Sequence, residues 1–112
     1  MSQDSKDVSD LEGAVVAAEL VAFHPGAVVS RTLVKKPTGT VTAFAFDAGE
    51  GLSEHTAPFD ALALNLQGEA DISISGTPCR VSAGQILRRP AGLPHAIKAV
   101  TPFKMLLIMI RA

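Results

Sequence analysis

The sequence contains neither tryptophan nor tyrosine, and it has a single cysteine, Cys79. One cysteine excludes an intrachain disulfide and a cysteine-based metal cluster. Long apolar runs are missing as well. The longest nearly continuous one, Met105 to Ile110, falls far short of the roughly 20 residues that a membrane-spanning helix needs. We therefore expect no span across a membrane.

An excess of charge of either sign is also absent. Lys and Arg total 10 and Asp and Glu total 11, which gives a formal net charge of −1. Without a basic field the chain has nothing to hold a phosphate backbone or an anionic membrane surface, so we expect no nucleic acid and no membrane as a partner. The polar, acidic start of the chain is unlike a signal peptide, which predicts a cytoplasmic protein.

What remains is the composition of a folded chain. Of the 112 residues, 47% are hydrophobic and 19% are charged, whereas a disordered chain has fewer apolar residues and a larger net charge. The length suits one domain. We expect a mobile acidic tail over residues 1–13, where Ser9 and Glu12 have the spacing of a capping box, and a single folded domain over residues 14–112.

Turn residues divide that domain into short segments typical of an all-β protein. Glycine and proline recur between runs rich in Val, Ile, Phe and Thr, and no stretch after residue 20 keeps helical periodicity for three turns. Short strands at this spacing indicate a sandwich or a barrel. The expected strands are 17–23, 27–35, 40–47, 52–56, 60–67, 70–75, 78–82, 85–89, 95–100 and 102–110.

Two of these strands carry more apolar surface than a small single domain can cover. Strand side chains alternate between faces, so Leu62, Leu64 and Leu66 share one face of their strand, and the last strand is nearly apolar on both faces. Double burial in a domain of this size usually needs a partner chain. We expect a homodimer, and the alternative is a monomer whose tail covers the apolar face.

Glycines and histidines in the middle of the chain follow a spaced pattern. Gly49 is followed by five residues and then His55, and after one further residue by Ala57. Ala61 comes after three more residues, and Gly68 after another six. Each of these spacings is common when taken singly, so this pattern indicates a particular fold only in combination with a second pattern.

A second pattern consists of Gly84, five residues, Pro90, one residue, Gly92, two residues and His95. The two patterns, in this order and with every spacing kept, resemble the two sequence motifs of the cupin superfamily. The resemblance covers residues 49–99, nearly half of the chain, and the overall look is of small, single-domain bacterial cupins of uncharacterised function. It implies an all-β cupin jelly-roll β-barrel, also called a double-stranded β-helix.

Many cupins hold a divalent metal inside the barrel on two His and one Glu of the first motif and one His of the second. By this resemblance His55 and His95 take two of the slots, whereas the second His slot is Ala57 and the Glu slot is Ala61. Alanine has no donor atom, and a catalytic zinc site keeps three protein ligands. We expect no resident cofactor, or at most a weakly held divalent metal (Zn, Fe, Mn, Ni or Cu) on His55 and His95.

Neighbouring charged residues do not restore the missing ligands. Glu54 and Asp60 each adjoin a slot residue, so on a regular strand they face the other way. Arg88 and Arg89 precede Pro90. One of the two arginines should point inward or to the barrel mouth and could hold a carboxylate, while the alternative for the pair is a solvated face or a salt bridge between subunits.

The alanines at the slot positions also change the shape of the interior, because each replaces a larger inward side chain by a methyl group. Unless a phenylalanine or Met105 fills the space, a pocket remains that suits waters or a small ligand. Cys79 is expected to be a small buried hydrophobe. The predicted pocket residues are His55, His95, Asn65, Ala57, Ala61 and Ala63.

Four functions are consistent with these residues. The first is a cupin with a degenerate metal site that binds a small organic molecule without turning it over. The second is a metal-dependent enzyme of oxygenase or isomerase type that uses His55 and His95. The third, metal-free acid–base catalysis as in cupin sugar epimerases, is disfavoured because it relies on a tyrosine acid and the chain has no tyrosine. The fourth is a structural or regulatory dimer without a ligand.

Overall fold

The structure, a computed structural model, describes residues 13–111. Within this range one short 3₁₀ turn, η2 (Ala17–Glu19), precedes a series of strands. No helix in the described range is long and apolar enough to cross a membrane. The strands are β1 (Val28–Lys36), β2 (Gly39–Phe46), β3 (Gly51–His55), β4 (Phe59–Gln67), β5 (Glu69–Ile74), β6 (Thr77–Ser82), β7 (Ile86–Arg89), β8 (His95–Ala99) and β9 (Phe103–Arg111).

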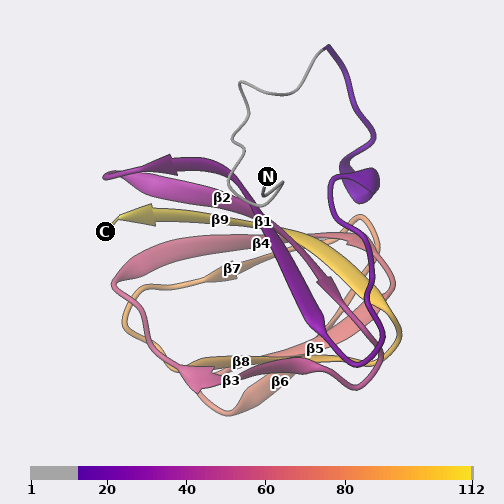
Figure 1. The fold of residues 1–112 in the computed structure, drawn as a ribbon. Coiled ribbons are helices and arrows are strands. Elements are labelled where there is room, and N and C mark those ends of the chain that lie inside the picture. Colours follow the sequence, from indigo (N-terminus) through magenta and orange to yellow (C-terminus); the bar gives the residue numbers. More distant parts are fainter. Residues whose placement is uncertain (1–12, 112) are drawn as a thin grey trace.

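The strands form two antiparallel sheets that face each other, which confirms the expected all-β jelly roll (Figure 1). One sheet has the order β1-β2-β9-β4-β7, and the other has the order β3-β8-β5-β6. Consecutive strands often lie in different sheets, so the chain crosses repeatedly between the layers. This crossing brings residues that are distant in sequence to the same end of the barrel.

The main core lies between the sheets. Alternate residues of each strand point into it, as the two-residue period of a strand requires. Phe46 and Phe103 are fully buried there and their ring centroids lie 5.4 Å apart. Met105 and Ile72 are also fully buried, so large side chains from both sheets fill the middle of the barrel.

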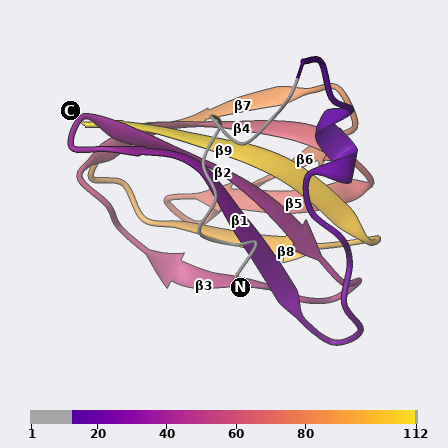
Figure 2. The same cartoon turned by 45° about the horizontal axis from the view of Figure 1, so that its top comes forward.

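A second apolar cluster covers the outer face of the five-stranded sheet. Val21 and Leu33 are buried with Ala43 and Ala45, and the half-buried Phe23 packs against them. The segment before β1 therefore lies over this sheet, as Figure 2 shows. The strand expected at 17–23 is wrong, because this segment buries its apolar residues by docking on the sheet from outside rather than by pairing within it.

The remaining expected strands are confirmed, with ends that differ by a residue or so. The docked segment also accounts for part of the outward apolar surface that suggested a partner chain. The rest of that surface, on β4, β7 and β9, stays open, and Ile86 and Ile110 are 57% and 56% exposed. The expected tail at residues 1–13 lies almost wholly outside the described residues.

Candidate functional site

Four strand ends meet at one end of the barrel. β3 and β7 finish there, β4 and β8 begin there, and the connecting turns are tied together. The Gly92 N–H donates to the carbonyl of Ala57 at 3.0 Å, and the Ala91 N–H donates to Asp60 Oδ1, also at 3.0 Å. These bonds hold the two motif segments side by side.

The two predicted histidines meet at this end. His55 and His95 are register partners on β3 and β8. Their Nε2 atoms lie 3.1 Å apart, and their ring centroids are 4.3 Å apart in an edge-on arrangement. His55 is exposed, whereas His95 is 6% exposed. The pair therefore runs from solvent into the barrel.

Backbone carbonyls orient both rings. Nδ1 of His55 lies 2.9 Å from the Ser53 carbonyl oxygen, and Nδ1 of His95 lies 3.3 Å from that of Leu93. A proton on each Nδ1 would leave two bare Nε2 lone pairs facing each other, and a proton on one Nε2 would join the rings by a hydrogen bond. Either way, the pair offers a proton-binding or ligand-binding point at the mouth.

The environment disfavours the charged form of His95. Burial is the largest cause that lowers its pKa from the usual 6.5, and the charges of Arg89 and His55 lower it further, while the hydrogen bond with Leu93 raises it. His95 is thus neutral at pH 7, and while its Nδ1 donates to the Leu93 carbonyl, its Nε2 can accept a hydrogen bond.

Arg89 is the residue whose placement the sequence left open. It is 2% exposed, and its Nε and Nη1 atoms are buried without a hydrogen-bond partner among residues 13–111. Burial lowers its pKa to about 10, so it still carries its charge at neutral pH. Arg88, its neighbour, points outward, and its Nη2 lies 4.0 Å from Oδ1 of Asp60.

The three alanines of the predicted pocket lie at or near this end of the barrel. Ala61 and Ala63 are 4% and 1% exposed and face the core from β4, and Ala57 lies in the turn before it. Ala61 is the register partner of Arg89 on β7. Residues that stand directly opposite each other have Cβ atoms about 4.5–5.5 Å apart, so the small side chain at 61 leaves room for the long one at 89.

Asn65 also points inward, but its amide is engaged with the backbone. It donates to the carbonyls of Gly68 and Val81 at 2.8 and 3.0 Å, and its oxygen accepts from the Gln67 N–H at 2.8 Å. These bonds brace the sharp passage from β4 to β5, where Gly68 has a positive φ of 79°. Asn65 therefore has a structural role in the passage from β4 to β5, which its place in the sequence does not indicate.

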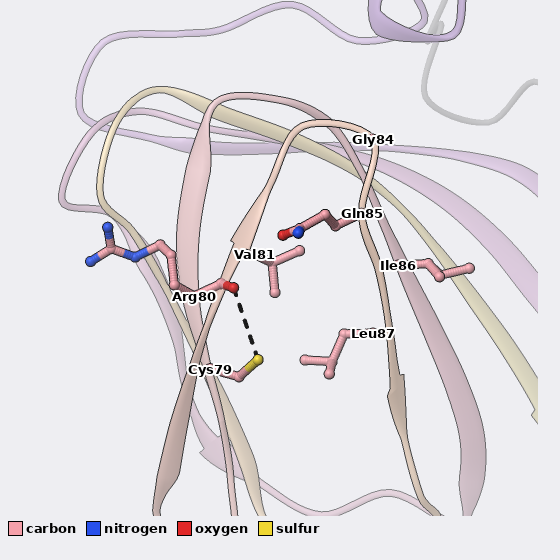
Figure 3. Close-up of a pocket in the computed structure, with 7 residues that line it drawn as sticks. All are labelled: Cys79, Arg80, Val81, Gly84, Gln85, Ile86 and Leu87. Carbon is pink, nitrogen blue, oxygen red and sulfur yellow. Dashed lines mark hydrogen bonds between the residues drawn. The ribbon is translucent and has the colours of Figure 1, made fainter.

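The pockets mapped within the described residues are not lined by the predicted pocket residues. One groove of about 460 Å³ lies between β6 and β7, the edge strands of the two sheets. Figure 3 shows Cys79 and Leu87 pointing toward each other there, with Arg80 and Ile86 pointing away. The expected burial of Cys79 is wrong, because an edge strand leaves one side open and the thiol is exposed.

The residues at the barrel end do not complete a metal site. Two converging Nε2 atoms 3.1 Å apart suit neighbouring ligands of one cation, since imidazole nitrogens bind zinc at about 2.0–2.1 Å. However, no group of three His, Cys, Asp or Glu side chains in the described range could hold a metal ion. The buried charge of Arg89 also opposes a cation nearby. The donor set is therefore one ligand short of a catalytic centre.

Comparison with solved structures gives close matches over most of the chain. A conserved protein of unknown function from Streptococcus pyogenes is 35% identical, with 95% of each chain covered and a TM-score of 0.87. A cupin superfamily protein from Desulfitobacterium hafniense is 31% identical over 91% of this chain and 94% of that one, also with a TM-score of 0.87.

A cupin 2 conserved barrel domain protein from Leptotrichia buccalis is 41% identical, with a TM-score of 0.82, over 84% of this chain and 46% of that chain. No family model matches the sequence, and no curated protein matches it.

Proposed function

The chain belongs to the cupin superfamily, and we propose that it binds a small organic molecule at the end of the barrel where His55 and His95 meet. The observation that carries this proposal is the pair itself, one ring exposed and the other buried, with Nε2 atoms 3.1 Å apart. A ligand reaching the mouth meets a polar point at His55 and can continue inward to His95. The site needs no resident metal to act in this way.

Metal-dependent catalysis is the second candidate, and the convergence of the two Nε2 atoms favours it. In that case His55 and His95 would hold the cation, and water or substrate atoms would complete its coordination. A metal so bound would supply Lewis-acid or redox chemistry. Two protein ligands predict weak retention, because dedicated sites use three or four.

Metal analysis and ligand screening separate these candidates. The purified protein is analysed for Zn, Fe, Mn, Ni and Cu beside a variant that carries His55→Ala and His95→Ala. The binding proposal expects no stoichiometric metal and a rise in melting temperature with some small organic compounds, which the double variant loses. A stoichiometric metal that disappears in the double variant would instead establish the metal-dependent candidate.

We also propose a homodimer through the open part of the outer face. Leu62 on β4 pairs with Ile108 on β9, which makes their outward side chains neighbours, and Leu64 pairs with Leu106, which already packs with the docked segment. Half-buried leucines next to the exposed Ile86 form an apolar patch of the kind that marks subunit contacts. Sedimentation should give twice the chain mass, and Leu64→Glu should shift it to the monomer. A monomeric wild type would favour the docked segment as sufficient cover.

A further inference from the structure

We propose that the ligand of this barrel carries a carboxylate and that Arg89 is the residue that recognises it. The inference rests on the proposed function and adds the chemical class of the ligand. Arg89 as a whole residue is 2% exposed, and the Nε and Nη1 atoms of its guanidinium are buried with no hydrogen-bond partner among residues 13–111. An ionised group removed from water without a partner costs several kcal/mol.

Three acids that could have neutralised Arg89 serve other partners in the described range. Asp60 lies on the outward face, where it accepts from the Ala91 N–H and approaches Arg88. Asp71 and Glu69 pair with Arg80 on the far sheet. The register partner of Arg89 is Ala61, a methyl group where an acid would fit. Within residues 13–111 the guanidinium is therefore left without an acid to pair with.

Its surroundings favour a carboxylate over a phosphate. One guanidinium and one carboxylate form a neutral pair, with two parallel hydrogen bonds in the geometry that arginine prefers. A phosphate group carries about −1.5 to −2 at neutral pH, so one arginine would leave excess negative charge in the interior. The nearby walls are apolar: Leu87 and Met109 pack against the same core cluster.

The same end of the barrel supplies an approach and a second contact. Arg89 ends β7, and His95 begins β8 after the turn tied to Ala57. A small acid whose carboxylate meets Arg89 would place its remaining atoms toward His95 and the exposed His55. Recognition would then combine one charged anchor in the barrel with a neutral polar pair at the mouth.

Matched pairs of probes test the charge directly. Formate, acetate, propionate and benzoate are compared with formamide, acetamide, propionamide and benzamide, and inorganic phosphate forms a third arm. Melting temperatures identify binders, and calorimetry measures their affinity in carboxylate-free buffer. Fragments of this size bind in the millimolar range even at good sites. The proteins are the full chain, Arg89→Met, Arg89→Gln and the matched control Arg88→Met.

We expect carboxylates to stabilise the wild type and Arg88→Met, and the amides to have little effect. Affinity should fall about 10- to 100-fold in both Arg89 variants, because hydrogen bonds to a charged group are lost. Circular dichroism shows whether each variant folds, and either Arg89 variant suffices for the test.

Four results would overturn the inference: no response to any carboxylate, amides that bind as well as carboxylates, unchanged affinity in a folded Arg89 variant, or tighter binding of phosphate than of every carboxylate. The proposed function is judged separately. If amides bind as well as acids and the His55 and His95 double variant abolishes binding, the barrel binds small molecules but Arg89 does not select them. If no compound binds, both proposals fail.

Discussion

Replacing Arg89 by methionine should stabilise the protein in the absence of ligand. Most changes at a buried position destabilise, but here the substitution removes a charge that has no partner among residues 13–111 and keeps an unbranched apolar stem of similar length. Replacing buried ionic groups by apolar ones of similar volume is often neutral or stabilising. The direction of the effect therefore tests whether the guanidinium is truly without a partner.

The pKa of Arg89 sets the scale of the expected gain. The lowering of this pKa to about 10 corresponds to about 3 kcal/mol at roughly 1.36 kcal/mol per unit. Relaxation of the surroundings and penetration of water reduce such a figure. We expect the free energy of unfolding to rise by about 1–3 kcal/mol, and the melting temperature by about 4 °C or more for each kcal/mol.

The stability gained by Arg89→Met should also depend on pH. The folded-state pKa of Arg89 is depressed, so above about pH 10 the native state releases this proton before the unfolded state does. The penalty is fully present at neutral pH and declines as the pH rises from about 10 toward 12.5. The difference between variant and wild type should be constant at neutral pH and should shrink above about pH 10.

Urea unfolding in carboxylate-free buffer measures this difference, with equal slopes as the check that the unfolded states match. Arg88→Met is the control and should change stability by no more than about 0.5 kcal/mol, as exposed substitutions do. A clear loss of stability in Arg89→Met would refute the reasoning, because it would mean that the guanidinium makes favourable contacts in the free protein.

Three other substitutions test further parts of the site. The folded-state pKa of His95 is depressed, so below the usual His pKa of 6.5 the unfolded chain takes up this proton first and the wild type loses stability. His95→Gln should make this loss on acidification smaller. A profile of urea stability against pH that does not change in the variant would contradict this. Asn65→Ala should cost about 2–4 kcal/mol in urea unfolding through its lost backbone hydrogen bonds, whereas Gln67→Ala, at an exposed side chain, should cost little. Ala61→Glu should be more stable than Ala61→Gln, which is of equal size, because an acid at position 61 would pair with Arg89. For the same reason Ala61→Glu should lose carboxylate binding. If Ala61→Glu is instead the less stable of the two, the guanidinium is out of reach of position 61.

The sequence predicted the strands because short alternating runs between glycine and proline turns determine most of a jelly roll. It failed at 17–23, where Leu20 and Val21 look like strand residues but pack against the outer face of the five-stranded sheet, with Val21 buried and Leu20 half-buried. It failed at Cys79 because alternation does not tell an edge strand from a central one, and β6 is an edge. These errors share a cause: burial depends on which strands become neighbours in space.

The same cause explains what could be foreseen at the site. The motif spacings predicted that the two histidines would lie together, because the family's fold brings these slots to one place, and their Nε2 atoms do meet. They did not decide between Arg88 and Arg89. Each of the two arginines has an apolar residue two positions earlier, on the same face of the strand. Alternation alone therefore allowed either arginine to face the interior. Only the pairing of β7 with β4 puts Arg89 opposite the inward Ala61.

Ala61 and Arg89 together suggest a change in the charge that this barrel accepts. By the family pattern position 61 is where a metal-binding cupin has its carboxylate, and a cation balances that carboxylate in the low-dielectric interior. Here the carboxylate slot is a methyl group, and the residue directly across from it is a buried cation. Opposite charges attract more strongly where water is scarce. The scaffold therefore keeps its two histidines while the charge at this end of the barrel has reversed, and the proposed carboxylate ligand would balance the charge of Arg89.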